Sequence, residues 1–192
     1  MKRVHEPGHF HELTFSCYRR KPLLTNDPWR CELSRLIDAA CFEAEFALNA
    51  FVLMPEHIHL LIFPQLPEPN IGRFLARIKQ PFSKHVKGIL IRSNSRLLSD
   101  LTVRERPGKA CFRFWQEGGG YDRNLFKPAT IEASINYIHL NPVQRGLCKR
   151  AIDWKWSSAR VYLAGTTDSD LPTITAPPSE LFDVGGIQFA NY

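Results

Sequence analysis

The sequence predicts an α+β fold of the ferredoxin-like, split βαβ type. In this fold an antiparallel sheet has helices on one face, and here one further helix is appended. Segments with strand composition and segments with helical periodicity follow one another in the order β, α, β-β, α, β and then a helix. The second and third strands are joined by a tight connection, which predicts an antiparallel hairpin. No internal repeat interrupts this order.

Each element follows from a local pattern. Strands are indicated by β-branched and aromatic residues, and helices by apolar residues that recur at spacings of three and four. Asn26-Asp27-Pro28 marks the first helix start, because aspartate can cap a helix and proline is tolerated in its first turn. In chain order, the expected elements are a strand at Leu13–Tyr18, a helix at Trp29–Ala44, strands at Phe46–Met54 and His57–Phe63, a helix at Ile71–Val86, a strand at Cys111–Trp115 and a helix at Ala129–Leu140.

Prolines, glycines and polar runs mark the expected breaks. Pro81 is expected to kink the second helix or split it in two. Pro142 is expected to end the last helix, because it disfavours helical geometry at the residue before it. Residues 92–109 are expected to form a mobile, basic excursion, and residues 118–120 a flexible glycine stretch. One domain is expected at residues 1–165, followed by a loosely ordered tail at residues 166–192.

The composition is that of a soluble globular protein, with 192 residues, 44% hydrophobic and 23% charged. No apolar run approaches the roughly 20 residues of a membrane span, and no apolar signal-peptide core follows Met1. We therefore expect a cytoplasmic protein that does not enter a membrane. Five cysteines without a CxxC pair argue against a zinc ribbon and a disulfide framework. The net charge of +6 favours a polyanionic partner without deciding for one.

Two histidines interrupt an otherwise apolar strand at His57-Ile58-His59. Because side chains alternate along a strand, both imidazoles share one face, with Cα atoms about 6.6 Å apart, and can reach one metal ion. The pattern alone also fits two surface histidines, and His9-Phe10-His11 repeats it without further support. A third ligand and a reactive group are available in Tyr137 and Asn141, which share one helix face at a spacing of four. Taken alone, Tyr137 could equally be a packing residue, and Asn141 a C-terminal helix cap.

Several segments together carry a resemblance to a known family. Residues 54–61 (MPEHIHLL) combined with residues 137–143 (YIHLNPV) and Gly146-Leu147 resemble the single-tyrosine HUH transposases, in particular the REP-associated tyrosine transposases. Further matches follow in the family's order over roughly residues 10–163, at residues 11–20, 115–116, 121–123 and 154–158. The chain departs from the family pattern at Gln144-Arg145, where members often have Arg-Ala, and in a longer spacing between Trp115 and Asp122.

The resemblance implies the ferredoxin-like fold and a set of roles. His57 and His59 correspond to the metal-binding pair, Asn141 to the residue that completes the metal site, and Tyr137 to the nucleophile. The implied reaction joins Tyr137 to a 5′-phosphate, frees a 3′-hydroxyl, and is reversed by the 3′-hydroxyl of another strand. A free phenol has a pKa of about 10, so a divalent ion, Mg²⁺ or Mn²⁺, is expected to polarise the scissile phosphate. The same ligands also suit Zn²⁺ or Ni²⁺, so ligand type does not identify the metal.

The implied partner is single-stranded DNA that forms hairpins, bound by a monomer or a homodimer. Basic residues that interleave with the apolar face of the second helix are expected to contact phosphates. These candidate DNA-binding residues are Arg73, Arg77, Lys79, Lys84 and Lys87.

Other functions stay open from the sequence. A protein of this fold that binds DNA hairpins without cleaving them is one, and a metal-dependent hydrolase that uses activated water, with Tyr137 dispensable, is another. A structural zinc site is disfavoured because thiolate ligands at zinc spacing are missing. Tyr121 is the fallback nucleophile, although Leu125, four residues later, cannot bind a metal.

Overall fold

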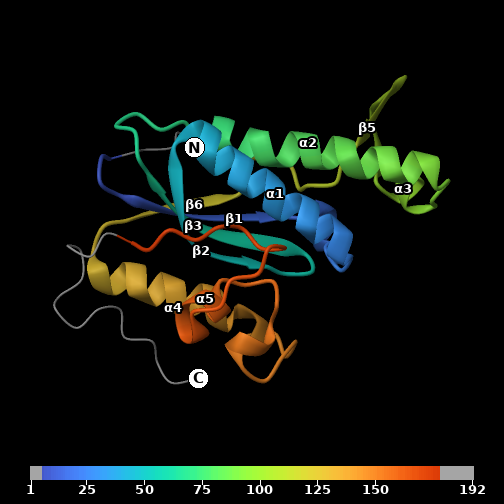
Figure 1. The fold of residues 1–192 in the computed structure, drawn as a ribbon. Helices are drawn as coiled ribbons and strands as arrows, with labels where there is room; N and C mark the ends of the chain where they lie inside the picture. Colours follow the sequence, from blue (N-terminus) through green and yellow to red (C-terminus); the bar gives the residue numbers. More distant parts are fainter. Residues whose placement is uncertain (1–5, 178–192) are drawn as a thin grey trace.

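The computed structural model describes residues 6–177 and contains one four-stranded antiparallel sheet, in the order β2-β3-β1-β6 (Figure 1). Its strands are β1 (Phe10–Ser16), β2 (Phe46–Leu53), β3 (His57–Pro64) and β6 (Tyr121–Leu125). β3 lies between β1 and β2 and is antiparallel to both. This is the strand order of the split βαβ arrangement, and the predicted ferredoxin-like fold is confirmed.

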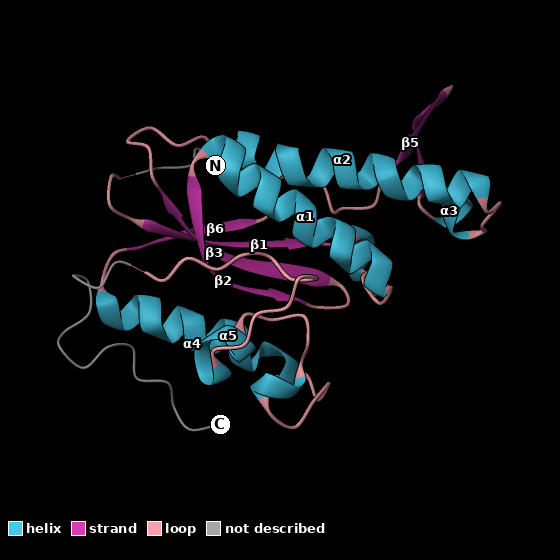
Figure 2. Ribbon diagram, in the orientation of Figure 1, coloured by secondary structure: helices cyan, strands magenta, loops and turns pink. Residues whose placement is uncertain are grey.

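Helices cover both faces of the sheet (Figures 1 and 2). α1 (Asp27–Ala44) and α2 (Ile71–Arg92) lie on one face, whereas α4 (Pro128–Gln144) and α5 (Ala159–Ala164) lie on the other. The appended helix that was expected to carry Tyr137 is α4. α1 begins after Asn26, whose side-chain oxygen accepts a hydrogen bond from the Trp29 amide at 3.1 Å. The cap is therefore Asn26, and not Asp27.

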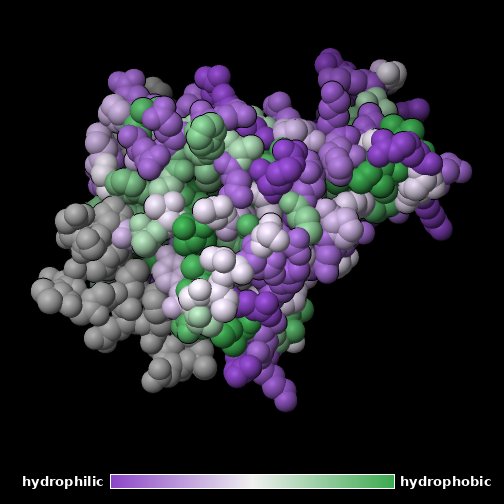
Figure 3. Space-filling view, in the orientation of Figure 1, coloured by the Kyte–Doolittle hydropathy of each residue, from purple (hydrophilic) through white to green (hydrophobic). Residues whose placement is uncertain are grey.

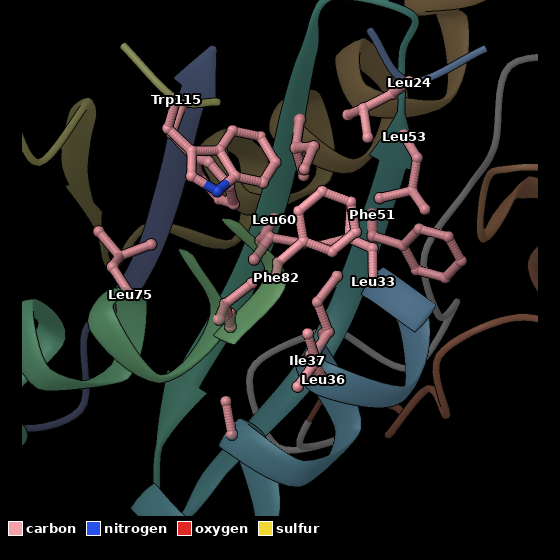
Figure 4. Close-up of a cluster of buried hydrophobic side chains, with 14 of the residues drawn as sticks. Leu24, Leu33, Leu36, Ile37, Phe51, Leu53, Leu60, Leu75, Phe82 and Trp115 are labelled. Atoms are coloured by element: carbon pink, nitrogen blue, oxygen red, sulfur yellow. The ribbon is translucent and has the colours of Figure 1, made fainter. Parts of the chain in front are cut away.

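Two apolar cores are separated by the sheet. The larger core joins α1 and α2 to the sheet, and Figure 4 shows part of it, with Leu60 of β3 near Leu33 of α1 and Phe82 of α2. Leu61 belongs to the smaller core beneath α4, together with Ile131, Ile135 and Ile138. This alternation along β3 directs every second side chain towards α4.

The predicted fourth strand at Cys111–Trp115 is wrong, because the strand that completes the sheet is β6. Cys111 and Phe112 belong instead to β5 (Lys109–Phe112), which pairs with β4 (Thr102–Arg106) in a separate hairpin. In Figure 1 this hairpin projects from the body near α3 (Leu97–Asp100). β6 is an edge strand with polar, mostly exposed or half-exposed side chains, so it lacks the apolar pattern that marks a buried strand.

The two breaks expected at prolines are wrong. α2 continues through Pro81, which is exposed, so the carbonyl left without its helical donor can be hydrated. α4 continues past Pro142 for two residues, so Tyr137 and Asn141 keep regular helical stacking. Gly120, at the end of the glycine stretch, has a φ of +75°, and a Cβ there would lie 2.1 Å from the Thr14 carbonyl oxygen. Only glycine allows β6 to approach β1 in this way.

Residues 166–177 run partly along the outer edge of β2. The Thr175 amide donates to the Leu48 carbonyl at 2.8 Å, and the Asn49 side chain donates to the Thr175 carbonyl at 2.9 Å. The rest of the expected tail, residues 178–192, lies outside the described residues, and the domain boundary stays a prediction. Among residues 6–177, no helix combines the length and the apolar character needed to cross a bilayer.

Candidate active site

The two histidines of β3 face each other on the α4 side of the sheet. His57 and His59 are 5% and 4% exposed, and their Nε2 atoms are 3.0 Å apart. Ile58 between them enters the opposite core. The alternation predicted for this strand therefore places both imidazoles in one site. The other HxH pair does not join them: His11 is fully buried and contacts Asp122 at 2.8 Å.

Helix α4 brings a phenol and an amide to the histidine pair. The Asn141 Nδ2 atom lies 3.3 Å from His59 Nε2. The Tyr137 ring stands nearly perpendicular to the His59 ring, at 85°, with 5.4 Å between centroids. Tyr137 is 43% exposed, so its ring is accessible to a substrate. The structure thus brings together all four residues that the sequence singled out for metal binding and nucleophilic attack.

The geometry of the three nitrogen- and oxygen-bearing side chains fits a divalent cation. Two ligands bound at about 2.1 Å and at right angles to one ion are about 3.0 Å apart, the separation found between the two Nε2 atoms. Asn141 Oδ1 is buried without a hydrogen-bond partner among residues 6–177. If the amide oxygen and nitrogen are exchanged, the oxygen faces His59, where it would serve as a ligand to a cation. Residues 6–177 contain no group of three His, Cys, Asp or Glu side chains that could hold a metal ion. The third candidate ligand here is the amide of Asn141.

Burial keeps both imidazoles in the neutral form that binds metals. Burial, together with the smaller effects of the neighbouring His57 and Arg20, lowers the pKa of His59 to about 3. Burial also lowers the pKa of His57, against the opposing effect of the adjacent Glu56 carboxylate. Neither ring needs to lose a proton before it binds a cation at neutral pH.

Each histidine has a polar neighbour on its second ring nitrogen. Thr14 Oγ1 is 2.8 Å from His59 Nδ1, and Thr14 is the cross-strand partner of His59. Glu56 Oε1 is 3.1 Å from His57 Nδ1. The same Glu56 oxygen accepts a hydrogen bond from Arg145, which follows α4. Such neighbours fix the orientation and tautomer of a metal-binding imidazole.

A cavity of about 460 Å³ opens beside the histidines and Tyr137. It lies between the sheet and α4, and it is large enough to hold part of a nucleotide. Its lining residues are Glu12, Thr14, Arg20, His57, His59, Tyr121, Arg123, Thr130, Ala133, Ser134 and Tyr137.

Arg20, which lines this cavity, has a left-handed backbone conformation. It is exposed, with a φ of +52°, and Arg19 before it has a φ of +53°. A non-glycine residue in this left-handed region costs about 1 kcal/mol or more, and such strain is concentrated at functional sites. Within residues 6–177 no carboxylate pairs with the Arg20 guanidinium, which leaves it available to an anion.

The five predicted DNA-binding residues of α2 lie elsewhere. α2 packs on the sheet face opposite the histidines, and none of the five lines the cavity. Arg77 is paired with Glu43, and Lys79 donates to the Gly118 carbonyl at 2.9 Å. In Figure 3 hydrophilic side chains gather along the upper edge of the molecule, over α2 and the β4–β5 hairpin. A DNA contact by Arg73, Lys84 or Lys87, which are exposed, stays a prediction.

Sequence reasoning missed most of the cavity lining. Glu12, which is 7% exposed and accepts a hydrogen bond from Ser134 at 3.1 Å, interrupts an apolar strand much as the histidines do, and that signal was available. Arg123 required the correct placement of β6. Arg20 and Arg145 reach the site through loop and helix-end geometry, for which the sequence carries no local pattern.

Comparisons with known proteins agree with this arrangement. The chain is 28% identical over 122 residues to a Haemophilus influenzae protein that carries the provisional name REP-associated tyrosine transposase. That match covers 62% of this chain and 61% of the relative, so the chain spans about three fifths of the relative's length. A solved structure of a REP-associated tyrosine transposase bound to a REP hairpin superposes with a TM-score of 0.65 at 20% identity, covering 100% of this chain and 98% of the other, which supports the fold. The family model for IS200-like transposases matches residues 8–140. Because this match extends over more than half of the chain, the protein belongs to the IS200-like transposase family.

Proposed function

We propose that this protein is a metal-dependent strand transferase that cuts and rejoins single-stranded DNA through Tyr137. The observation that carries the proposal is the position of an exposed phenol against two buried, neutral imidazoles whose Nε2 atoms are 3.0 Å apart. Membership of a transposase family supports a reaction on DNA. A structural relative was solved with a REP hairpin, which supports a hairpin-forming single strand as the substrate.

Tyr137 supplies the nucleophile in this proposal. Its phenolic oxygen attacks the scissile phosphorus in line, the bond between phosphorus and the 3′-oxygen breaks, and the departing oxygen takes up a proton to become a 3′-hydroxyl. The products are a 5′-phosphotyrosine on Tyr137 and a free 3′ end. Attack on the phosphotyrosine by the 3′-hydroxyl of another strand restores the phenol and joins the DNA. The tyrosyl ester conserves the phosphodiester bond, so rejoining needs no nucleotide cofactor.

His57, His59 and Asn141 would hold the divalent cation, for which Mg²⁺ or Mn²⁺ is proposed. The ion supplies Lewis-acid polarisation of a phosphate oxygen and compensates the charge that develops during attack. Family membership supports metal dependence in general terms. Arg20, on the rim of the same cavity, is proposed to contact a phosphate next to the scissile one, because its guanidinium is exposed and unpaired within the described part of the chain.

A covalent-adduct assay tests the proposal. The DNA is a set of 3′-labelled oligonucleotides in which a hairpin stem adjoins a randomised single strand, incubated with the protein and Mn²⁺. A labelled protein band on a denaturing gel is expected, and Tyr137→Phe should abolish it. Tyr121→Phe is the matched control, because Tyr121 is an exposed tyrosine that lines the same cavity.

Each alternative predicts a different gel. Loss of the band in Tyr121→Phe alone would assign the nucleophile to Tyr121. Free cleaved DNA that persists in Tyr137→Phe would identify a hydrolase that uses activated water. Binding of the hairpin oligonucleotides without cleavage, with every divalent metal added, would identify a binding protein that has lost catalysis.

A further inference from the structure

The contacts of Glu56 connect the histidine strand to the end of the tyrosine helix. Glu56 is the last residue of the connection between β2 and β3, and it is 9% exposed. Its backbone carbonyl accepts a hydrogen bond from the Cys17 amide at 2.9 Å, which ties this connection to the end of β1. Its side-chain Oε1 lies 3.1 Å from His57 Nδ1. His57 Nδ1 is buried and makes no hydrogen bond of good geometry within residues 6–177, so the nearby carboxylate contacts it as a charged neighbour.

Arg145, at the C-terminal end of α4, contacts the same oxygen of the Glu56 carboxylate. It directly follows α4 and lies four residues beyond Asn141, on the same side of the helix. Its guanidinium donates a hydrogen bond to Glu56 Oε1. The arginine side chain is half exposed, whereas the carboxylate side chain is mostly buried. One oxygen atom thus links His57, at the start of β3, to the end of the helix that carries Tyr137 and Asn141.

The chemistry of this contact determines which nitrogen of His57 is free. A carboxylate beside Nδ1 stabilises the tautomer with its proton on Nδ1, and this leaves the Nε2 lone pair directed at His59 Nε2 and the cation position. A mostly buried carboxylate is unfavourable without a partner, and Arg145 provides one. For His59 the corresponding neighbour is Thr14, which belongs to the sheet itself. The His57 neighbour, Glu56, is also hydrogen-bonded to Arg145 at the end of α4.

We infer that Glu56 and Arg145 act together as a positioning pair, which sets the tautomer of His57 and holds the tyrosine helix in register with the two histidines. Neither residue is expected to touch DNA or the reacting phosphate. The inference rests on the proposed function for its consequence in catalysis, but its effect on the His57 ring does not depend on DNA. A pair that only anchors the connection between β2 and β3 would stabilise the fold and leave the ring tautomer unchanged.

The first measurement uses the metal-free protein. In ¹⁵N-labelled wild-type protein, two-bond imidazole correlations are expected to show the His57 proton on Nδ1. In Glu56→Ala a large fraction of the Nε2-protonated tautomer should appear, while the His59 signals stay unchanged because Thr14 is intact. A folded Glu56→Ala variant with an unchanged His57 tautomer would overturn the inference. If this variant does not fold, the Mn²⁺ measurements on Glu56→Gln decide instead.

The second measurement is Mn²⁺ affinity, followed by the loss of the free-ion signal in electron paramagnetic resonance. Glu56→Gln is expected to weaken Mn²⁺ binding about tenfold, at the lower end of the effect of removing an outer-shell partner. Arg145→Gln should weaken it less, and Arg145→Lys should restore most of the loss, because lysine keeps the charge. Arg150→Gln is the matched control: Arg150 also follows α4, but its partner is Asp153, and it does not contact the site. Equal Mn²⁺ affinities in the wild type and Glu56→Gln would refute the role in metal binding.

The third measurement tests whether the two residues act as a unit. The rate of Tyr137–DNA adduct formation is measured at saturating Mn²⁺ in both Gln variants and in the double variant. A displaced helix is expected to slow attack by about tenfold or more in each single variant, with no further slowing in the double variant. Independent effects that multiply in the double variant would contradict a coupled pair. If wild-type protein forms no adduct, the proposed function fails, whereas the tautomer measurement still decides the inference.

Discussion

Gly120 lies directly against the Thr14 carbonyl, just before β6, so substituting it gives a sharp test of the fold. In Gly120→Ala the new Cβ would lie 2.1 Å from the Thr14 carbonyl oxygen, where real Cβ contacts stay above 3.0 Å. β6 must therefore move by about 0.9 Å or more away from β1, next to the Thr14–Tyr121 register pair. The left-handed φ of +75° adds a strain of about 1–2 kcal/mol. With about 1–3 kcal/mol for weakened strand pairing, we expect Gly120→Ala to lower the free energy of unfolding by about 2–5 kcal/mol.

Gly118→Ala is the matched control for this experiment. Gly118 has a φ of +89°, but a Cβ there would meet nothing within 4 Å, so only the conformational strain of about 1–2 kcal/mol is expected. The assay is urea denaturation followed by tryptophan fluorescence, with both variants compared to the wild type. The reasoning is refuted if Gly120→Ala is no more destabilising than Gly118→Ala. Where Gly120→Ala remains folded, adduct formation should also slow, because β6 carries two residues of the cavity wall.

Three further predictions concern the site and the helix behind it. Thr14→Val removes the hydroxyl 2.8 Å from His59 Nδ1 and should weaken Mn²⁺ binding about tenfold in calorimetry, whereas Thr130→Val, in the same cavity, should not. Asn141→Leu should weaken Mn²⁺ binding and Asn141→Asp should strengthen it, each by about tenfold, because hard cations favour charged oxygen ligands; equal affinities would exclude Asn141 as a ligand. Burial lowers the pKa of His139 from 6.5 to about 3. Between these two pH values the unfolded state binds a proton at His139 that the folded state does not bind. The contribution of the neutral ring to stability is therefore complete above about pH 6.5 and is lost as the pH falls towards 3. In urea titrations the loss of stability between pH 6.5 and 5 should be about 2 kcal/mol larger in the wild type than in His139→Gln, which keeps His57 and His59, and identical pH dependence in both proteins would contradict it.

The part of the site that follows local periodicity could be predicted from the sequence. Strand alternation is enough to pair His57 with His59, and helical spacing is enough to pair Tyr137 with Asn141. That these two pairs meet was implied by the family resemblance and not by either pattern, because contacts between distant segments depend on the packing of α4 against the sheet. Arg145 illustrates the limit, since its contact with Glu56 joins residues 89 positions apart.

Errors in the predicted elements have definite physical causes. β6 was missed because an edge strand with polar side chains shows no apolar alternation. Helices α2 and α4 both continue through a proline, for different reasons. At Pro81 the lost hydrogen bond lies on the exposed side of the helix, and at Pro142 it falls in the last turn, where little helix remains to be disrupted.

The sheet separates the cavity beside the histidines from the basic side chains of α2, and this restricts how one DNA molecule could contact both. The helix axes on the two faces are about 20 Å apart, at about 10 Å per layer, so no single phosphate can reach both sides. At the β2 edge of the sheet, residues 166–177 run partly alongside the strand. At the opposite edge, Lys79 of α2 donates a hydrogen bond to the Gly118 carbonyl, just before β6. We expect a DNA strand that contacts both Tyr137 and α2 to pass along the β6 edge, where Arg123 and the exposed ring of Tyr121 lie.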